Sequence, residues 1–255
     1  MIATLIGAAI IGIALGVLGS GGSILTIPVL VFGLGIGEKT AIASSLVIVG
    51  GIAGTGALLA ARRGLVVPRC LLLFGVPGVG GAAIGGWFAP LAPEWLQMAI
   101  FGVLVVVAAW FTLRASMMVT ARPGCGPWPQ AAGVGAGIGA LTGFVGVGGG
   151  FLLVPALLRF GGLGLDRAVG TSLALIAFNC IIGLAGQMTG PAPELMPLVT
   201  LAVFVVTGVI GLIAGRHYTR DMSPTIARYA FIVLLAIIAV YTVWHTLMLA
   251  DGLPG

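Results

Sequence analysis

The chain has 255 residues, of which 60% are apolar and only 7% are charged. Because soluble domains carry about 25% charged residues, this composition excludes a protein whose surface mostly faces water. The net charge of +5 comes from basic residues scattered between long apolar stretches, so it does not indicate nucleic-acid binding. The composition predicts a polytopic membrane protein.

The spanning elements are expected to be helices. Stretches such as Ile100–Phe111 and Ala230–Val243 are apolar on all sides, which is typical of helices embedded in lipid. A transmembrane barrel would instead show segments of about 10 residues with alternating polarity. The predicted fold class is therefore all-α, and in chain order the ten apolar segments are Ile2–Leu18, Ile24–Leu34, Ala41–Ala61, Val66–Ala89, Trp95–Leu113, Ala131–Val145, Phe151–Phe160, Ala168–Met188, Leu195–Gly215 and Ile226–Leu249.

The second segment of each half is too short for a full crossing, which needs about 20 residues. These segments, Ile24–Leu34 and Phe151–Phe160, each follow a run of glycines. Either two crossings or one re-entrant hairpin returns the chain to the side it left. Ten spans, or six spans with two hairpins, both remain open.

Basic residues are distributed very unequally between the two sides of this topology. Lys39 falls on one side, and ten arginines fall on the other: Arg62, Arg63, Arg69, Arg114, Arg122, Arg159, Arg167, Arg216, Arg220 and Arg228. Positive loops stay in the cytoplasm, so both termini are expected outside it. No basic region precedes the first apolar stretch, so a cleaved signal peptide is not expected.

A motif in the first half recurs 127 positions later. Gly12-x-x-x-Gly16-x-x-Gly19-Ser20-Gly21-Gly22-Ser23-x-x-x-x-Pro28-x-Leu30 returns as Gly139-x-x-x-Gly143-x-x-Gly146-Val147-Gly148-Gly149-Gly150-x-x-x-x-Pro155-x-Leu157. The same offset pairs Ser44-Ser45-Leu46 with Thr171-Ser172-Leu173. Each half changes direction an odd number of times, so the two repeats are predicted to be inverted in the membrane. The expected organisation is a first repeat over 1–118, a cytoplasmic linker over 119–130 and a second repeat over 131–255.

The two glycine runs are candidates for binding a small anion. Consecutive glycines interrupt a helix, and such a break survives in lipid only where it lines a cavity or packs in protein. A new helix is expected after each run, with unpaired N–H groups at its start. Nearby hydroxyls and an amide supply further donors, although small polar residues also mediate helix packing, and both interpretations stay open. The candidate substrate-binding residues are Gly19, Ser20, Gly21, Gly22, Ser23, Ser44, Ser45, Gly146, Gly148, Gly149, Gly150, Thr171, Ser172 and Asn179.

Catalytic and metal chemistry is not expected. The three cysteines have no metal-ligand spacing and are predicted to be buried or inert thiols. Ser20 and Ser23 have no histidine in the membrane interior to activate them. The sequence thus predicts no enzyme, no cofactor and no metal. The expected partners are a small anion and membrane lipid, with no nucleic acid; a homodimer, and a proton or sodium as coupling ion, are left open.

The doubled glycine motif, followed in each half by Ser44-Ser45-Leu46 or Thr171-Ser172-Leu173, resembles the TauE/SafE sulfite exporter family. The resemblance extends from about Leu5 to Trp244. It implies a secondary transporter that exports sulfite, a sulfonate such as sulfoacetate, or a related oxyanion across the bacterial inner membrane. An anion channel of the same architecture, or an uptake carrier, is the alternative. The serines in the first glycine run depart from the second copy, which leaves the substrate open.

Overall fold

The computed structural model describes residues 2–18, 22–115, 125–145, 150–188, 194–219 and 233. Every regular element in these ranges is helical. In chain order they are α1 (Ile2–Leu18), α2 (Gly22–Pro28), a π-helix (Val29–Gly33), α3 (Glu38–Arg62), α4 (Pro68–Phe88), a 3₁₀ turn (Ala89–Leu91), α5 (Glu94–Ala115), α6 (Trp128–Val145), α7 (Gly150–Arg159), α8 (Leu165–Gln187) and α9 (Leu198–Thr219).

The helices follow the predicted apolar segments, with ends that differ by at most four residues. The prediction for Ile2–Leu18 matches α1 at both ends, whereas Ile24–Leu34 is divided into α2 and the π-helix. The division falls at Pro28, which has no N–H to continue the α-helical pattern. The last predicted segment, Ile226–Leu249, lies outside the described residues apart from position 233.

Four of the described helices are long and apolar enough to cross a membrane, namely α3, α4 with its 3₁₀ turn, α8 and α9. Several also carry an exposed apolar face. On α9, Val206, Ile210 and Ile213 are all more than half exposed, at spacings that place them on one side of the helix. Such a face is unfavourable in water and fits contact with lipid tails.

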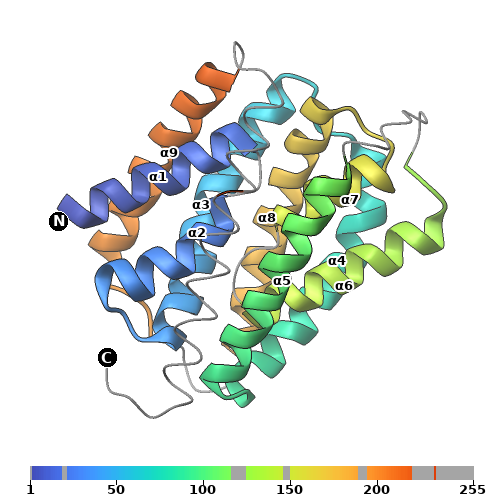
Figure 1. The fold of residues 1–255 in the computed structure, drawn as a ribbon. Helices are drawn as coiled ribbons and strands as arrows, with labels where there is room; N and C mark the ends of the chain where they lie inside the picture. The colour runs from blue at the N-terminus through green and yellow to red at the C-terminus, as the bar shows by residue number, and fades with distance from the viewer. Residues whose placement is uncertain are drawn as a thin grey trace.

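On one flank of the bundle, α1 packs along α9 (Figure 1). Gly12 lies against the backbone of Gly208. One turn later, Gly16 lies against the backbone of Leu212. Residue numbers rise together in the two helices, so α1 and α9 run parallel. A Cβ on either glycine would overlap the facing backbone, so the approach requires glycine.

The other flank repeats this arrangement, with α6 packed along α4 (Figure 1). Here Gly139 lies against Gly78. One turn later, Gly143 lies against Ala82. This pair is also parallel. Because α1 and α6 are equivalent in the repeat, the two flanks are formed by corresponding helices, and each flank combines one helix from each half.

Between the flanks, α3 and α8 cross in opposite directions. A Cβ on Gly50 would lie 3.0 Å from Cβ of Cys180. Two turns further along α3, a Cβ on Gly56 would lie 3.1 Å from the Leu173 side chain. The partner number falls as the α3 number rises, so these two equivalent helices are antiparallel.

The repeat continues into α4 and α9 at a new offset of 130, which the sequence analysis did not find. The loop before α9 is longer than the loop before α4, and this difference shifts the alignment by three positions. The matched positions include two buried phenylalanines, Phe74 and Phe204, and glycines at helix contacts, Gly78 with Gly208 and Gly81 with Gly211.

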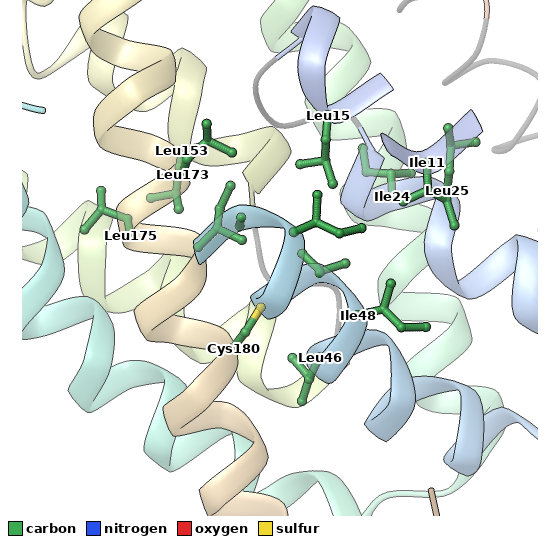
Figure 2. Close-up of a cluster of buried hydrophobic side chains, with 14 of the residues drawn as sticks. Ile11, Leu15, Ile24, Leu25, Leu46, Ile48, Leu153, Leu173, Leu175 and Cys180 are labelled. Carbon is green, nitrogen blue, oxygen red and sulfur yellow. The ribbon is translucent and has the colours of Figure 1, made fainter. Parts of the chain in front are cut away.

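The core gathers side chains from both halves (Figure 2). Leu15 and Ile24 of the first half and Leu153 and Leu173 of the second belong to one buried cluster. Leu46 lies in the same cluster on α3. The halves therefore do not have separate cores, and their burial depends on each other.

A disulfide joins Cys70 to Cys125, with Cα atoms 5.4 Å apart. The prediction that these two cysteines are free, inert thiols is therefore wrong. The prediction that the cysteines are buried is confirmed, since all three side chains are buried. Cys70 lies in the first turn of α4, and Cys125 lies just before α6. Because α4 and α6 pack in parallel, their first turns lie side by side and bring the two cysteines together. The two cysteines are 55 residues apart in the sequence, so this pairing could not be predicted from their spacing. Cys180 remains a free thiol.

Candidate functional site

The predicted hydroxyl residues lie in two separate places. Ser44 and Ser45 are in the second turn of α3, and Thr171 and Ser172 are in the second turn of α8. These antiparallel helices face each other where Gly50 and Gly54 of α3 meet Cys180 and Ala177 of α8, about seven residues from either pair. At a rise of 1.5 Å per residue, the two pairs are about 22 Å apart along the bundle. They do not meet around one small ligand.

The first hydroxyl of each pair accepts a hydrogen bond from the backbone of a loop that leads into another helix. Ser44 Oγ accepts a hydrogen bond of 3.1 Å from the backbone N–H of Met196. Thr171 Oγ1 accepts one of 3.0 Å from the backbone N–H of Val67. Met196 immediately precedes the N-cap of α9, and Val67 is the N-cap of α4. Each bond holds the backbone that leads into the next long helix of the bundle, and both support the packing interpretation for these hydroxyls.

The second hydroxyl of each pair donates within its own helix. Ser45 Oγ donates to the Ile42 carbonyl at 2.7 Å, three residues back. Ser172 Oγ donates to the Val169 carbonyl at 2.8 Å in the same way. Bonds of this kind satisfy a buried hydroxyl without a partner helix.

The glycine runs themselves fall mostly outside the described residues: Gly19, Ser20, Gly21, Gly146, Gly148 and Gly149. Gly22 begins α2, and Gly150 begins α7. Ser23 belongs to α2, and its side chain is outside the described part of the structure.

The helices that lead into the two glycine runs end at opposite ends of the bundle. Leu18 ends α1 two residues beyond Gly16, which lies against the penultimate turn of α9. Val145 ends α6 two residues beyond Gly143, which lies near the last turns of α4. Since α9 and α4 run in opposite directions, the described flanks of the two motifs are separated along the bundle.

Two glutamine side chains donate hydrogen bonds to backbone carbonyls at the end of α6, just before the second glycine run. Gln97 Nε2 donates to the carbonyls of Phe144 at 3.1 Å and Ala89 at 2.9 Å. Gln187 Nε2 approaches the Gly143 carbonyl at 3.5 Å. These bonds occupy carbonyls that a helix end leaves unpaired. Sequence reasoning missed Gln97, although a lone glutamine in the apolar segment Trp95–Leu113 was a usable signal.

Asn179 lies near the crossing point of α3 and α8, away from both hydroxyl pairs. Its side chain is buried, and Oδ1 has no hydrogen-bond partner. A Cβ on Gly78 would lie 3.4 Å from this oxygen. A buried amide oxygen without a partner is costly, which is why this position is a better ligand candidate than the satisfied hydroxyls.

Charged residues divide the bundle into two unlike ends. One end, here called the arginine end, carries arginines from the last turns of α3, α7 and α9 and from the first turns of α4 and α8: Arg62, Arg63, Arg69, Arg159, Arg167 and Arg216. The other end carries Glu38, Lys39 and Glu194. The predicted separation of Lys39 from the arginines is thus present in the described residues.

No cluster of three or more histidine, cysteine, aspartate or glutamate side chains able to hold a metal occurs within the described ranges. The buried polar side chains of these ranges are hydroxyls and amides, and they lie at separate levels of the bundle. Such groups donate hydrogen bonds and suit recognition of an oxyanion.

Apolar helices of membrane-spanning length, in two interlocked halves, define a multi-pass helical membrane protein. A family model described as Sulfite exporter TauE/SafE matches residues 4–242, and the chain belongs to this family. A "Probable membrane transporter protein" of Xylella fastidiosa (strain 9a5c) is 29% identical over 96% of both chains. A "Probable membrane transporter protein y4hK" of Sinorhizobium fredii (strain NBRC 101917 / NGR234) is 28% identical over 81% of this chain and 82% of its own. The protein is a membrane transporter.

Proposed function

We propose that this protein is a secondary transporter that exports a small sulfur-containing or organic oxyanion, such as sulfite or a sulfonate, by alternating access. The observation that carries the proposal is the antiparallel crossing of the equivalent helices α3 and α8. Two copies of one unit in opposite orientations can exchange conformations, so that a site between them opens first to one side and then to the other.

Helix directions support inversion of the repeats. Contacts place α1, α3 and α9 parallel to one another, since Gly51 lies against Val205 of α9 and Gly56 against Leu212. Contacts also place α4, α6 and α8 parallel, since Gly75 lies against Leu175 of α8 and Gly86 lies against Gly183. The two sets run in opposite directions, and each set contains the counterparts of the other.

The substrate path is proposed to run from one glycine motif to the other through the level of Asn179. At each end, the helix that leads into a glycine motif ends level with the hydroxyl pair of the other half: α1, which ends at Leu18, with Thr171 and Ser172, and α6, which ends at Val145, with Ser44 and Ser45. Asn179 lies between these levels. We infer a path with polar side chains at each end and near the centre. This path replaces a single anion site formed by both glycine motifs together.

The charge distribution supports an orientation for this path. Arginine-rich loops remain in the cytoplasm, so the arginine end is proposed to face inward in the bacterial inner membrane, with both termini outside. A cytoplasmic surface rich in guanidinium groups raises the local concentration of anions. This arrangement suits a carrier that collects its substrate from the cytoplasm.

Flux of labelled anions into proteoliposomes tests the proposal. The panel contains sulfite, sulfoacetate and a carboxylate, with imposed proton or sodium gradients. A carrier gives flux that saturates with substrate and depends on a coupling ion. Conductance that does not saturate would identify a channel instead, and absence of flux for every anion would refute the proposal.

A glycine substitution tests the role of the motifs. Gly22→Leu places a large side chain where α2 begins, and it is expected to abolish flux while the protein still inserts. Gly133→Leu is the matched control, because a side chain at that position meets open space. Equal flux in the two variants would exclude the first motif from the substrate path.

A further inference from the structure

Arg216 differs from the other arginines of the arginine end. Among arginines whose side chains the structure describes, the remaining five are exposed, whereas Arg216 is partly buried. Its Nη1 is fully buried and has no hydrogen-bond partner. A guanidinium group normally pairs all of its buried N–H groups, so this nitrogen calls for an acceptor that the described side chains do not supply.

The charges around Arg216 favour an anion as that acceptor. Among the described residues, Arg63 and Asp166 are the charged groups that act on it electrostatically. None of the ion pairs or hydrogen bonds found in the described residues joins Asp166 to Arg216. Two positive groups and one negative group leave an excess of one positive charge at a partly desolvated position, where an attraction for an anion is stronger than in water.

Arg216 also lies at the depth of predicted site residues. Leu212, one turn earlier in α9, meets Gly56 of α3, and Leu173 of α8 meets the same glycine. One turn further toward the arginine end, Gly170 meets Ala60 of α3. Arg216 is therefore level with Gly170 and Thr171, at the mouth of the proposed path.

The repeat shows that this cation is confined to one end. The counterpart of Arg216 at the offset of 130 is Gly86, whose Cβ position is 2.5 Å from the Gly183 carbonyl. No guanidinium group can occupy that place at the opposite end without moving α8. The two mouths of an otherwise repeated path thus differ in charge.

We propose that Arg216 binds the negatively charged group of the substrate at the arginine end, in a site for a small oxyanion such as a sulfonate, sulfite or carboxylate. This assignment rests on the proposed transport function. The planar guanidinium group donates two parallel hydrogen bonds to such an anion. The buried Nη1 supplies one of these donors, and loss of water around it strengthens the bond.

The test compares full-length wild type with Arg216→Gln, Arg216→Lys and the matched control Arg167→Gln, an exposed arginine of the same end. Initial rates are measured in proteoliposomes with substrate added at the arginine end. Arg216→Gln is expected to raise KM by about tenfold or more, because a charge-assisted bond is lost, while kcat changes far less. Arg216→Lys keeps the positive charge but lacks the paired N–H donors of the guanidinium group. Its KM should lie between those of the wild type and Arg216→Gln. Arg167→Gln removes one of five exposed charges at the arginine end and should change KM far less than Arg216→Gln does.

A binding measurement separates this inference from the transport proposal. Millimolar sulfite, sulfoacetate or acetate is expected to raise the melting temperature of the purified wild type and of Arg167→Gln, but not of Arg216→Gln. If stabilisation depends on Arg216 and no flux is seen, the site stands and the transport proposal fails. If flux is seen and Arg216→Gln equals Arg167→Gln in KM and in stabilisation, this inference is overturned. It is also overturned if none of the anions stabilises the wild type.

Discussion

Close glycine packing between α4 and α6 leads to a sharp prediction for Gly139→Ala. A Cβ at this position would lie 2.7 Å from the carbonyl carbon and 2.9 Å from Cα of Gly78, and closer still to the carbonyl oxygen. Carbon atoms rest about 3.5 Å apart, so the carbon contacts alone require α6 to move away by roughly 0.8 Å, and the contact with the carbonyl oxygen requires more. The obstacle is backbone and not a flexible side chain, which means that no rotamer change relieves it.

A displacement of this size affects more than one contact. A gap of about 0.5–1 Å forfeits a quarter to a half of the dispersion energy between facing atoms, and α6 also meets α4 one turn to either side, at Gly135 and Gly143. Overpacking of this kind costs about 1–3 kcal/mol. At about 2–4 °C per kcal/mol for a chain of this size, Gly139→Ala should lower the melting temperature by roughly 5 °C.

The matched control is Gly137→Ala on the same helix, where an added Cβ has nothing within 4 Å. This variant gains helix propensity of about 1 kcal/mol without a clash, so it should melt at or above the wild-type temperature. Thermal unfolding of the purified proteins in one detergent, followed by tryptophan fluorescence, provides the comparison. Equal melting temperatures for the two variants would refute the packing argument.

Three further predictions concern the disulfide, the orientation and a loop contact. The Cys70–Cys125 pair lies at the arginine end, which the proposed orientation places in the reducing cytoplasm, so its disulfide is tested on purified protein in air. There, replacing both cysteines by serine should lower the unfolding free energy by at most about 4 kcal/mol, the chain-entropy value for a loop of this length; thermal unfolding checks this, and reductant should shift the wild type but leave the variant unchanged. Cysteines introduced at Lys39 and Arg167 should react with an impermeant maleimide added to opposite sides of the membrane, and labelling of both from one side would contradict the proposed topology. Thr171→Val should cost about 1 kcal/mol, because the N–H at the start of α4 loses its acceptor; an unchanged melting temperature would show that water replaces the hydroxyl.

The helical segments and the duplication could be predicted because each depends on local patterns. Apolar length defines a membrane helix, and the spacing of glycines and prolines aligned Gly12–Leu30 with its copy. The extension of the repeat into α4 and α9 was not found, because an alignment with one offset fails once the second half has three more residues before α9 than the first half has before α4.

The candidate site was less predictable, since it depends on depth in the bundle. Ser44 and Thr171 are equivalent in sequence, yet antiparallel packing of α3 and α8 places them at opposite ends. Neither this separation nor the partners Met196 and Val67 can be inferred from spacing. In the sequence, Arg216 resembles any other arginine near the end of a helix. Only the structure shows that its Nη1 is buried without a hydrogen-bond partner.

The exchange of first helices between the halves has a consequence for how such a chain could arise. Because α1 packs on α9 and α6 packs on α4, a single unit would leave its glycine-lined helix without a neighbour. A precursor of half the length would have needed a second copy of itself, inserted the other way up, to cover that surface. If the repeats are inverted as proposed and arose by fusion of such units, each unit had to insert in both orientations, which a strong bias of arginines to one side would have prevented.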